Sequence, residues 1–283
     1  MKSRPPSSPL TDLAWHQSLA DALRSRWETY VQTRERARKK PTPRRIHALR
    51  IETRRLAAQV SLAGTLTDAK TKRLRRTLKR TLRLTAAVRD ADVHASSLEA
   101  LRPAHPVLKT LVAELRHERK DAARTVSRKL TARANCRRIN RLMRALRERA
   151  VQPNDRAMLA RVGDDALTAL TGALAAKDTT PEALHRSRLA VKKVRYLVEV
   201  LPVPLGACGN AGLASLRTWQ RTLGQIHDAD LLISRLERFA QEHPSRRPDV
   251  EPVRRLLARR RQRWLRTFCA QGPPLARGKP QQA

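Results

Sequence analysis

The positions of the prolines constrain the fold of this chain most strongly. They fall in short groups, and the interior of a helix excludes proline. The long spans between the groups are rich in Ala, Leu, Arg and Glu, which favour helix, whereas β-branched residues rarely cluster and no Asn-Gly hairpin turn occurs. We therefore predict an all-α protein. The expected helices cover residues 10–38, 43–63, 68–101, 105–133, 137–150, 154–176, 181–201, 209–241 and 250–269.

The chain also repeats itself at a fixed offset. His47 aligns with His185, which sets the offset at 185 − 47 = 138 residues, and the alignment continues without a gap. The same or similar residues recur at the pairs Pro43 and Pro181, Arg50 and Arg188, Arg54 and Lys192, Arg55 and Lys193, Leu78 and Leu216, Lys79 and Arg217, Arg83 and Arg221, Leu98 and Leu236, Arg116 and Arg254, and Arg128 and Arg266. Such a repeat predicts two related helical units joined in tandem.

The repeat predicts the domain organisation. We expect one domain over residues 10–270, made of two pseudo-symmetric antiparallel helical bundles. The first bundle would cover residues 10–133 and the second residues 137–270, with disordered tails at 1–9 and 271–283.

The charge of the chain indicates its kind of partner. It contains 61 Lys and Arg against 25 Asp and Glu, a formal net charge of +36, which would repel itself in a compact fold that has no anionic partner. Aromatic residues make up only 3% of the chain, whereas single-stranded nucleic acid is usually bound by bases stacking on aromatic rings. A ligand without bases is therefore favoured. Nucleic acid stays the alternative, because the sequence pI of about 11.7 permits it.

Other classes of protein leave signals that this sequence lacks. No window approaches eighteen consecutive apolar residues and no apolar stretch follows the basic N-terminus, so we expect a cytoplasmic protein with no membrane partner. The three cysteines are far apart and suggest neither a disulfide framework nor a thiolate metal site. Without a Gly-rich phosphate loop, a G-x-S-x-G elbow or an H-E-x-x-H motif, we expect no enzyme, no cofactor and no metal.

Basic side chains form rows on the predicted helices. His47, Arg50 and Arg54 are spaced i, i+3 and i+7, which places them on one side of a helix beside an apolar stripe. The repeat carries a matching row at His185, Arg188 and Lys192. A further row is formed by Arg76, Lys79, Arg80 and Arg83, with counterparts at Arg217 and Arg221. Arg binds phosphate oxygens with a planar fork, Lys acts as a point charge, and His joins when a polyanion keeps it protonated.

Acidic residues are rare and stand beside the basic rows. Asp90, Asp92, Asp228 and Asp230 could act as paired carboxylates, together with His227, in a metal-dependent phosphohydrolase, which is the less favoured alternative function. Their helical spacing instead predicts that they orient a neighbouring Arg or His by hydrogen bonds. His94 has no ligand-like spacing and is expected at the surface or at a helix cap.

The paired motifs resemble those of the CHAD family, the conserved-histidine α-helical domains. The resemblance rests on His47, Arg50, Arg54 and Arg55 with Val-Arg-Asp-Ala-Asp-Val at 88–93, and on the second copy from His185 to Tyr196 with Leu-Gly-Gln-Ile-His-Asp-Ala-Asp-Leu at 223–231. It implies two helical bundles around a basic central channel, non-catalytic binding of inorganic polyphosphate, and association with polyphosphate granules. The symmetry is broken where Ala57 stands opposite Arg195 and Arg89 opposite His227.

The motifs and the resemblance together give one set of expected polyphosphate ligands. These are His47, Arg50, Arg54, Arg55, Arg76, Lys79, Arg83, Arg89, His185, Arg188, Lys192, Lys193, Arg195, Arg217, Arg221 and His227.

Overall fold

The computed structural model describes residues 12–67, 69–130, 136–149, 152, 154–175, 177–199 and 210–271, and no strand occurs in these ranges. The all-α prediction is confirmed. The helices are α1 (Asp12–Lys39), α2 (Pro43–Leu66), α3 (Lys72–Leu84), α4 (Ala86–Glu99), α5 (Leu108–Lys129), α6 (Cys136–Glu148), α7 (Asp155–Ala175), α8 (Pro181–Val198), α9 (Asn210–Glu242) and α10 (Arg247–Ala270), with short 3-10 turns at Arg102–Ala104 and Pro244–Arg246. Apart from Gln271, the predicted disordered tails lie outside the described residues.

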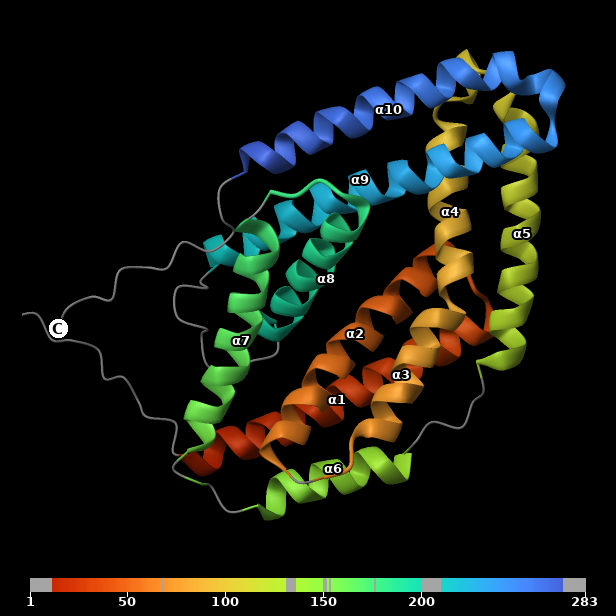
Figure 1. Cartoon of the computed structure of the whole chain (residues 1–283). Coiled ribbons are helices and arrows are strands. Elements are labelled where there is room, and N and C mark those ends of the chain that lie inside the picture. The colour runs from red at the N-terminus through yellow and green to blue at the C-terminus, as the bar shows by residue number, and fades with distance from the viewer. Residues whose placement is uncertain are drawn as a thin grey trace, which may run out of the picture.

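The helices pack mainly as consecutive pairs. Figure 1 shows α4 beside α5 and α9 beside α10, and the same holds for α1 with α2 and α7 with α8. The helix α2 also contacts α8, so the helices that carry the two basic rows meet. Within the described ranges, no helix combines the length and the apolar character needed to span a bilayer.

Two hydrophobic cores hold the molecule together. The larger core includes Tyr30 and Leu56 from the first predicted unit, and Val191 and Phe268 from the second. The smaller core lies where α4 and α5 meet α9 and α10, and it likewise joins the two units. Because α6 packs against α1 and both cores contain residues from each unit, the two units share their cores.

The helix boundaries follow the repeat at first and then depart from it. The helices α2 and α8 begin at residues 43 and 181, which are 138 residues apart. The buried residues of the last helices follow an offset of 250 − 108 = 142 instead, as the following pairs show. They are Leu108 with Val250, Leu111 with Val253, Leu115 with Leu257, Ala123 with Leu265 and Val126 with Phe268. The gapless alignment of Arg116 with Arg254 and of Arg128 with Arg266 is therefore corrected by four residues, while the duplication itself stays a prediction.

The expected single helix over residues 68–101 is divided at Thr85, so this prediction was wrong. The Arg50 guanidinium donates hydrogen bonds to the Leu82 carbonyl at 2.7 Å and to the Thr85 hydroxyl at 3.1 Å. The Thr85 hydroxyl in turn donates to the Thr81 carbonyl at 2.9 Å. Side chains that take over helix carbonyls in this way bend a helix, and α3 and α4 consequently run in different directions (Figure 1).

The starts of the functional helices are fixed by local sequence. Thr42 and Thr180 each accept a hydrogen bond from the backbone N–H three residues later, and a proline follows each of them at the first helical position. Gly64 allows the start of α3 to pack closely on α2, because a Cβ at this position would lie 2.7 Å from the Thr71 methyl group. The basic rows are thereby placed at defined positions relative to one another.

Candidate functional site

Four cations from α2 and α8 converge where these two helices meet. Arg50 and Arg54 of α2 lie near Arg188 and Lys192 of α8. The positive charges are so close that repulsion across the contact lowers the pKa values of Arg50, Arg188 and Lys192. We call these four residues the central cluster. The prediction that the two basic rows face one another therefore agrees with the geometry of these four residues.

Lys192 shows the electrostatic consequence most clearly. Burial lowers the pKa of its ammonium group to about 7, helped by repulsion from Arg188, Arg54 and Arg50, while Asp228 alone opposes the shift. Lys192 has no hydrogen-bond or ion-pair partner among the described residues. The side chain is thus held where a negative charge would stabilise its protonated form.

The arginines of the central cluster differ in how available they are to bind an anion. Burial and repulsion from Arg54 lower the pKa of Arg50 to about 10, yet its guanidinium is already bound to the bend between α3 and α4. Burial also lowers the pKa of Arg188, although Asp228 and Asp90 oppose the shift, and its buried Nε atom has no hydrogen-bond partner in the described structure. Arg54 has no hydrogen-bond or ion-pair partner in the described part of the chain. Arg54, Arg188 and Lys192 are therefore the residues best placed to bind an anion.

The histidines of the two rows have basic neighbours. The rings of His185 and His227 lie 6.3 Å apart between their centroids, and burial with repulsion from Arg188 lowers the pKa of His227. Burial and repulsion from Arg89 lower the pKa of His47 in the same way. Arg89 and His227 are thus neighbours of the two repeat histidines, as their aligned positions predict. Without an anion, His47 and His227 are mainly neutral at pH 7.

The four aspartates divide into two pairs. Asp92 accepts a hydrogen bond from the Arg119 Nε atom at 2.9 Å, and Asp230 accepts one from the Arg261 Nε atom. This geometry agrees with the predicted orienting role, and the arginines they bind occupy corresponding places in α5 and α10. Asp90 and Asp228 are instead close enough to the half-buried Arg188 to favour its charged form.

His94 was expected at the surface or at a cap, and the structure corrects this. It lies in the middle of α4 and is half-buried, and burial lowers its pKa although Asp90 and Asp228 act in the opposite direction. Its position four residues after Asp90, on the same side of the helix, is the sequence signal that could have placed it there. Among the described residues, no three His, Cys, Asp or Glu side chains are grouped so as to hold a metal ion.

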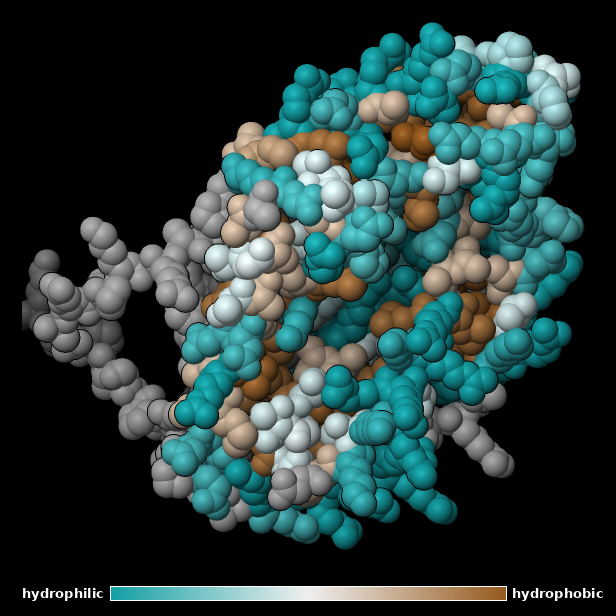
Figure 2. All heavy atoms as spheres, viewed as in Figure 1, coloured by the Kyte–Doolittle hydropathy of each residue, from teal (hydrophilic) through white to brown (hydrophobic). Residues whose placement is uncertain are grey.

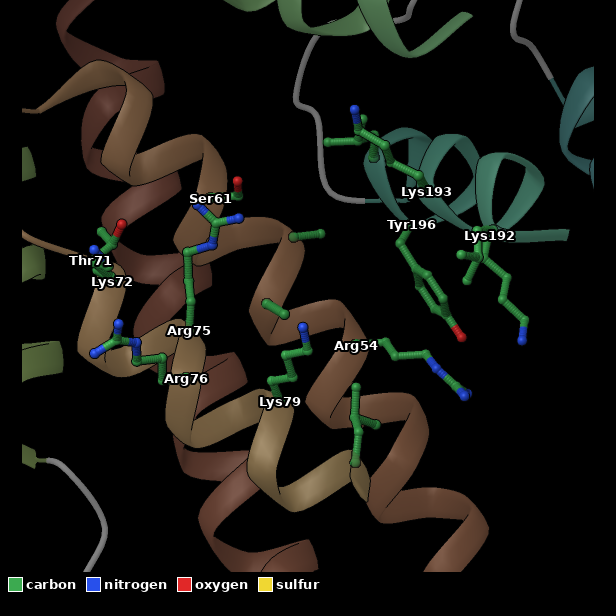
Figure 3. A pocket seen from close by; sticks show the side chains of 15 residues that line it. Arg54, Ser61, Thr71, Lys72, Arg75, Arg76, Lys79, Lys192, Lys193 and Tyr196 are labelled. Carbon is green, nitrogen blue, oxygen red and sulfur yellow. The ribbon is translucent and has the colours of Figure 1, made fainter. Parts of the chain in front are cut away.

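A groove of about 840 Å³ adjoins the central cluster, and we call it the first groove. Figure 3 shows Arg54, Lys192 and Tyr196 near one end and Arg76 on the opposite wall, which α3 forms. Its cationic lining residues are Arg54, Lys72, Arg75, Arg76, Lys79, Lys192 and Lys193, and none of the described residues that line it is acidic. Figure 2 shows the molecule hollowed between α8 and the α2–α4 side, with hydrophilic residues at the bottom of the hollow. Lys72 and Arg75 were missed from the sequence, although they precede Arg76 and Lys79 by four residues each, a helical spacing that could have placed them on the same side.

The remaining predicted ligands lie in other settings. Arg55 binds Glu52 and Glu199 at 2.9 and 3.0 Å, and Arg195 shares Glu199 with it, so their charges are already balanced by carboxylates. This network joins α2 to α8 and holds the two basic rows together. Three further predicted ligands are exposed and do not line the first groove, namely Arg83, Arg217 and Arg221.

Two comparisons with known proteins found a match to this chain. A family model described as the CHAD domain matches residues 21–210. The crystal structure of the CHAD domain from the plant Ricinus communis superposes with a TM-score of 0.68 at 20% sequence identity, and the match covers 91% of this chain and 92% of that chain. At this identity the likeness shows the shared fold alone. No curated protein matches the chain.

Proposed function

Because this chain belongs to the CHAD domain family, we propose that it binds inorganic polyphosphate without catalysis, through the central cluster and the first groove. The observation that carries the proposal is the convergence of Arg54, Arg188 and Lys192 from two helices. Cations that repel one another in the free protein are stabilised by an anion that contacts several of them at once. A chain of linked phosphates, with a charge on every unit, has the required charge density.

The chemistry of the groove favours phosphates over bases. Its walls present Arg and Lys, which bind phosphate oxygens by charge-assisted hydrogen bonds. Tyr196 is the one aromatic residue among the described residues that line the groove, and its ring is buried with the Arg195 guanidinium 4.1 Å from its centroid. A buried, covered ring offers no face for a nucleobase.

We expect binding in the cytoplasm, on polyphosphate granules. There the protein would meet long polyphosphate chains at high local concentration, and its formal charge of +36 would favour their capture.

A competition experiment tests the proposed ligand. Long-chain polyphosphate should bind the purified protein with an affinity that falls steeply as salt rises, because bound phosphates release counterions. DNA and RNA at equal phosphate concentration should displace little of it, and no orthophosphate should be released with added Mg²⁺ or Mn²⁺. Displacement by nucleic acid would contradict the ligand preference, and metal-dependent phosphate release would contradict the non-catalytic role.

A further inference from the structure

A second cationic groove lies beyond the first. It has a volume of about 770 Å³ and is formed by the turn before α3, the first turns of α3, and α6. Its charged lining residues are all basic, namely Lys70, Lys72, Arg73, Arg76, Arg138 and Arg141. Thr71, Lys72 and Arg76 line both grooves, so the second groove adjoins the first.

The helix α3 is far more basic than the part of α9 that aligns with it. The helix contains seven Lys and Arg residues and no acidic residue, whereas the aligned stretch 210–222 in α9 contains only Arg217 and Arg221. Other arginines of the molecule are paired with carboxylates, as Arg119 is with Asp92. Lys70, Arg73 and Arg141 are exposed and have no hydrogen-bond or ion-pair partner for their side chains in the described structure. An unbalanced cationic surface therefore extends from the central cluster in one direction.

The wall between the two grooves has a defined position. Thr71 packs against Gly64 of α2 so closely that no Cβ fits at that residue, which fixes the start of α3. From Lys72 to Lys79 the helix α3 is about 10 Å long at 1.5 Å per residue, so the path along it has room for several phosphates in succession.

We propose that a polyphosphate chain bound at the central cluster continues along α3 into the second groove, which is a subsite that only long chains reach. This inference rests on the proposed function and adds that the affinity depends on the length of the polyphosphate chain. Short polyphosphate fits within the central cluster and the first groove. A long chain gains the contacts to Lys70, Arg73 and Arg141 in addition.

A chain-length comparison tests this subsite. The variant Lys70→Gln, Arg73→Gln, Arg141→Gln is compared with the control Arg259→Gln, Arg263→Gln, Arg266→Gln, which removes three exposed charges from α10. For tripolyphosphate, both variants should match the wild-type affinity within about twofold. For long-chain polyphosphate, the groove variant alone should lose about tenfold or more, and its slope of log affinity against log salt should fall by about two, as expected for three lost phosphate contacts.

The outcomes separate the two proposals. An unchanged long-chain affinity in the groove variant, or an equal loss in the α10 control, would overturn the subsite while wild-type binding still supports the proposed function. If the wild-type protein binds neither ligand, the proposed function fails and the subsite fails with it. Circular dichroism and the urea midpoint should be the same in all three proteins, because every altered side chain is exposed.

Discussion

Replacing Arg54 and Lys192 together by glutamine should weaken polyphosphate binding by about a hundredfold or more. Each side chain lines the first groove without a protein partner, so each is available for hydrogen bonds to phosphate. Hydrogen bonds to charged groups are worth about 1.5–3 kcal/mol each, and two of them correspond to about two to four orders of magnitude in affinity. Titration with long-chain polyphosphate at constant salt measures the loss.

The same double variant should be more stable than the wild-type protein in the absence of ligand. Lys192 is half-buried beside Arg188, Arg54 and Arg50, and the double variant removes two of these mutually repelling charges. We expect the free energy of unfolding to rise by about 1–3 kcal/mol at pH 7, as urea denaturation would show. Arg50 is left in place because it holds the bend at Thr85.

A matched control separates a local effect from the loss of net charge. Arg259→Gln with Arg263→Gln also removes two exposed basic charges, but from α10, and should leave affinity within about threefold of wild type. If both double variants lost the same affinity, the binding would arise from unspecific attraction to the net charge and not from a defined site. Loss of stability in the Arg54 and Lys192 variant would contradict the repulsion that we infer.

Polyphosphate affinity should fall by about tenfold or more between pH 6.5 and pH 8.5. The pKa of Lys192 is about 7 in the free protein, whereas bound phosphates favour its charged form, so binding takes up a proton above pH 7. Each pH unit above the pKa of the group in the free protein lowers the affinity by up to about tenfold. The lowered pKa values of His47 and His227 extend the same trend toward acid pH.

Lys192→Arg is the variant that tests this cause, since arginine stays protonated throughout the range. Its affinity should change much less than that of the wild type between pH 7 and pH 8.5. Wild-type affinity that is constant or that rises over this range would contradict the assignment.

The stability of the free protein should follow the opposite trend with pH. The folded-state pKa of Lys192 lies below its usual value of 10.5, so the unfolded chain binds more protons between about pH 7 and pH 10.5. The destabilisation from Lys192 is therefore fully present below pH 7 and is lost as pH rises through this window.

Sequence patterns could predict the helices and the basic rows because both depend on local spacing. Prolines and helix-forming residues place α2 and α8 correctly, and the i, i+3, i+7 spacing identifies Arg54 and Lys192. The fixed offset identified Arg188 as the partner of Arg50. The family model and the structural match then confirmed the resemblance that these motifs suggested.

Other features depend on contacts between distant segments, which local patterns do not contain. The bend at Thr85 involves Arg50, 35 residues earlier, which donates hydrogen bonds to the Thr85 hydroxyl and to the Leu82 carbonyl. The pairing of Arg55 with Glu199 across 144 residues removes a predicted ligand from the groove surface. Arg141 belongs to the second groove only because α6, which packs against α1 and α2, lines this groove together with the start of α3.

The helices α3 and α9, which the repeat aligns, therefore contribute unequally to the cationic surface. The cations that extend beyond the central cluster come from α3 and α6, while Arg217 and Arg221 of α9 line neither groove. A bound chain would accordingly run from the central cluster along α3 toward α6. The duplication predicted from the sequence would then have kept the meeting point of α2 and α8, while the dense cationic row arose on α3 and not on α9.

The central claim is that α2 and α8 together form one phosphate-binding site, and a crystal structure of the protein with polyphosphate tests it most directly. We predict a continuous row of phosphates within hydrogen-bond distance of Arg54, Arg188 and Lys192 at the same time. Phosphates bound only on outer helix faces, with these three side chains unliganded, would contradict the account.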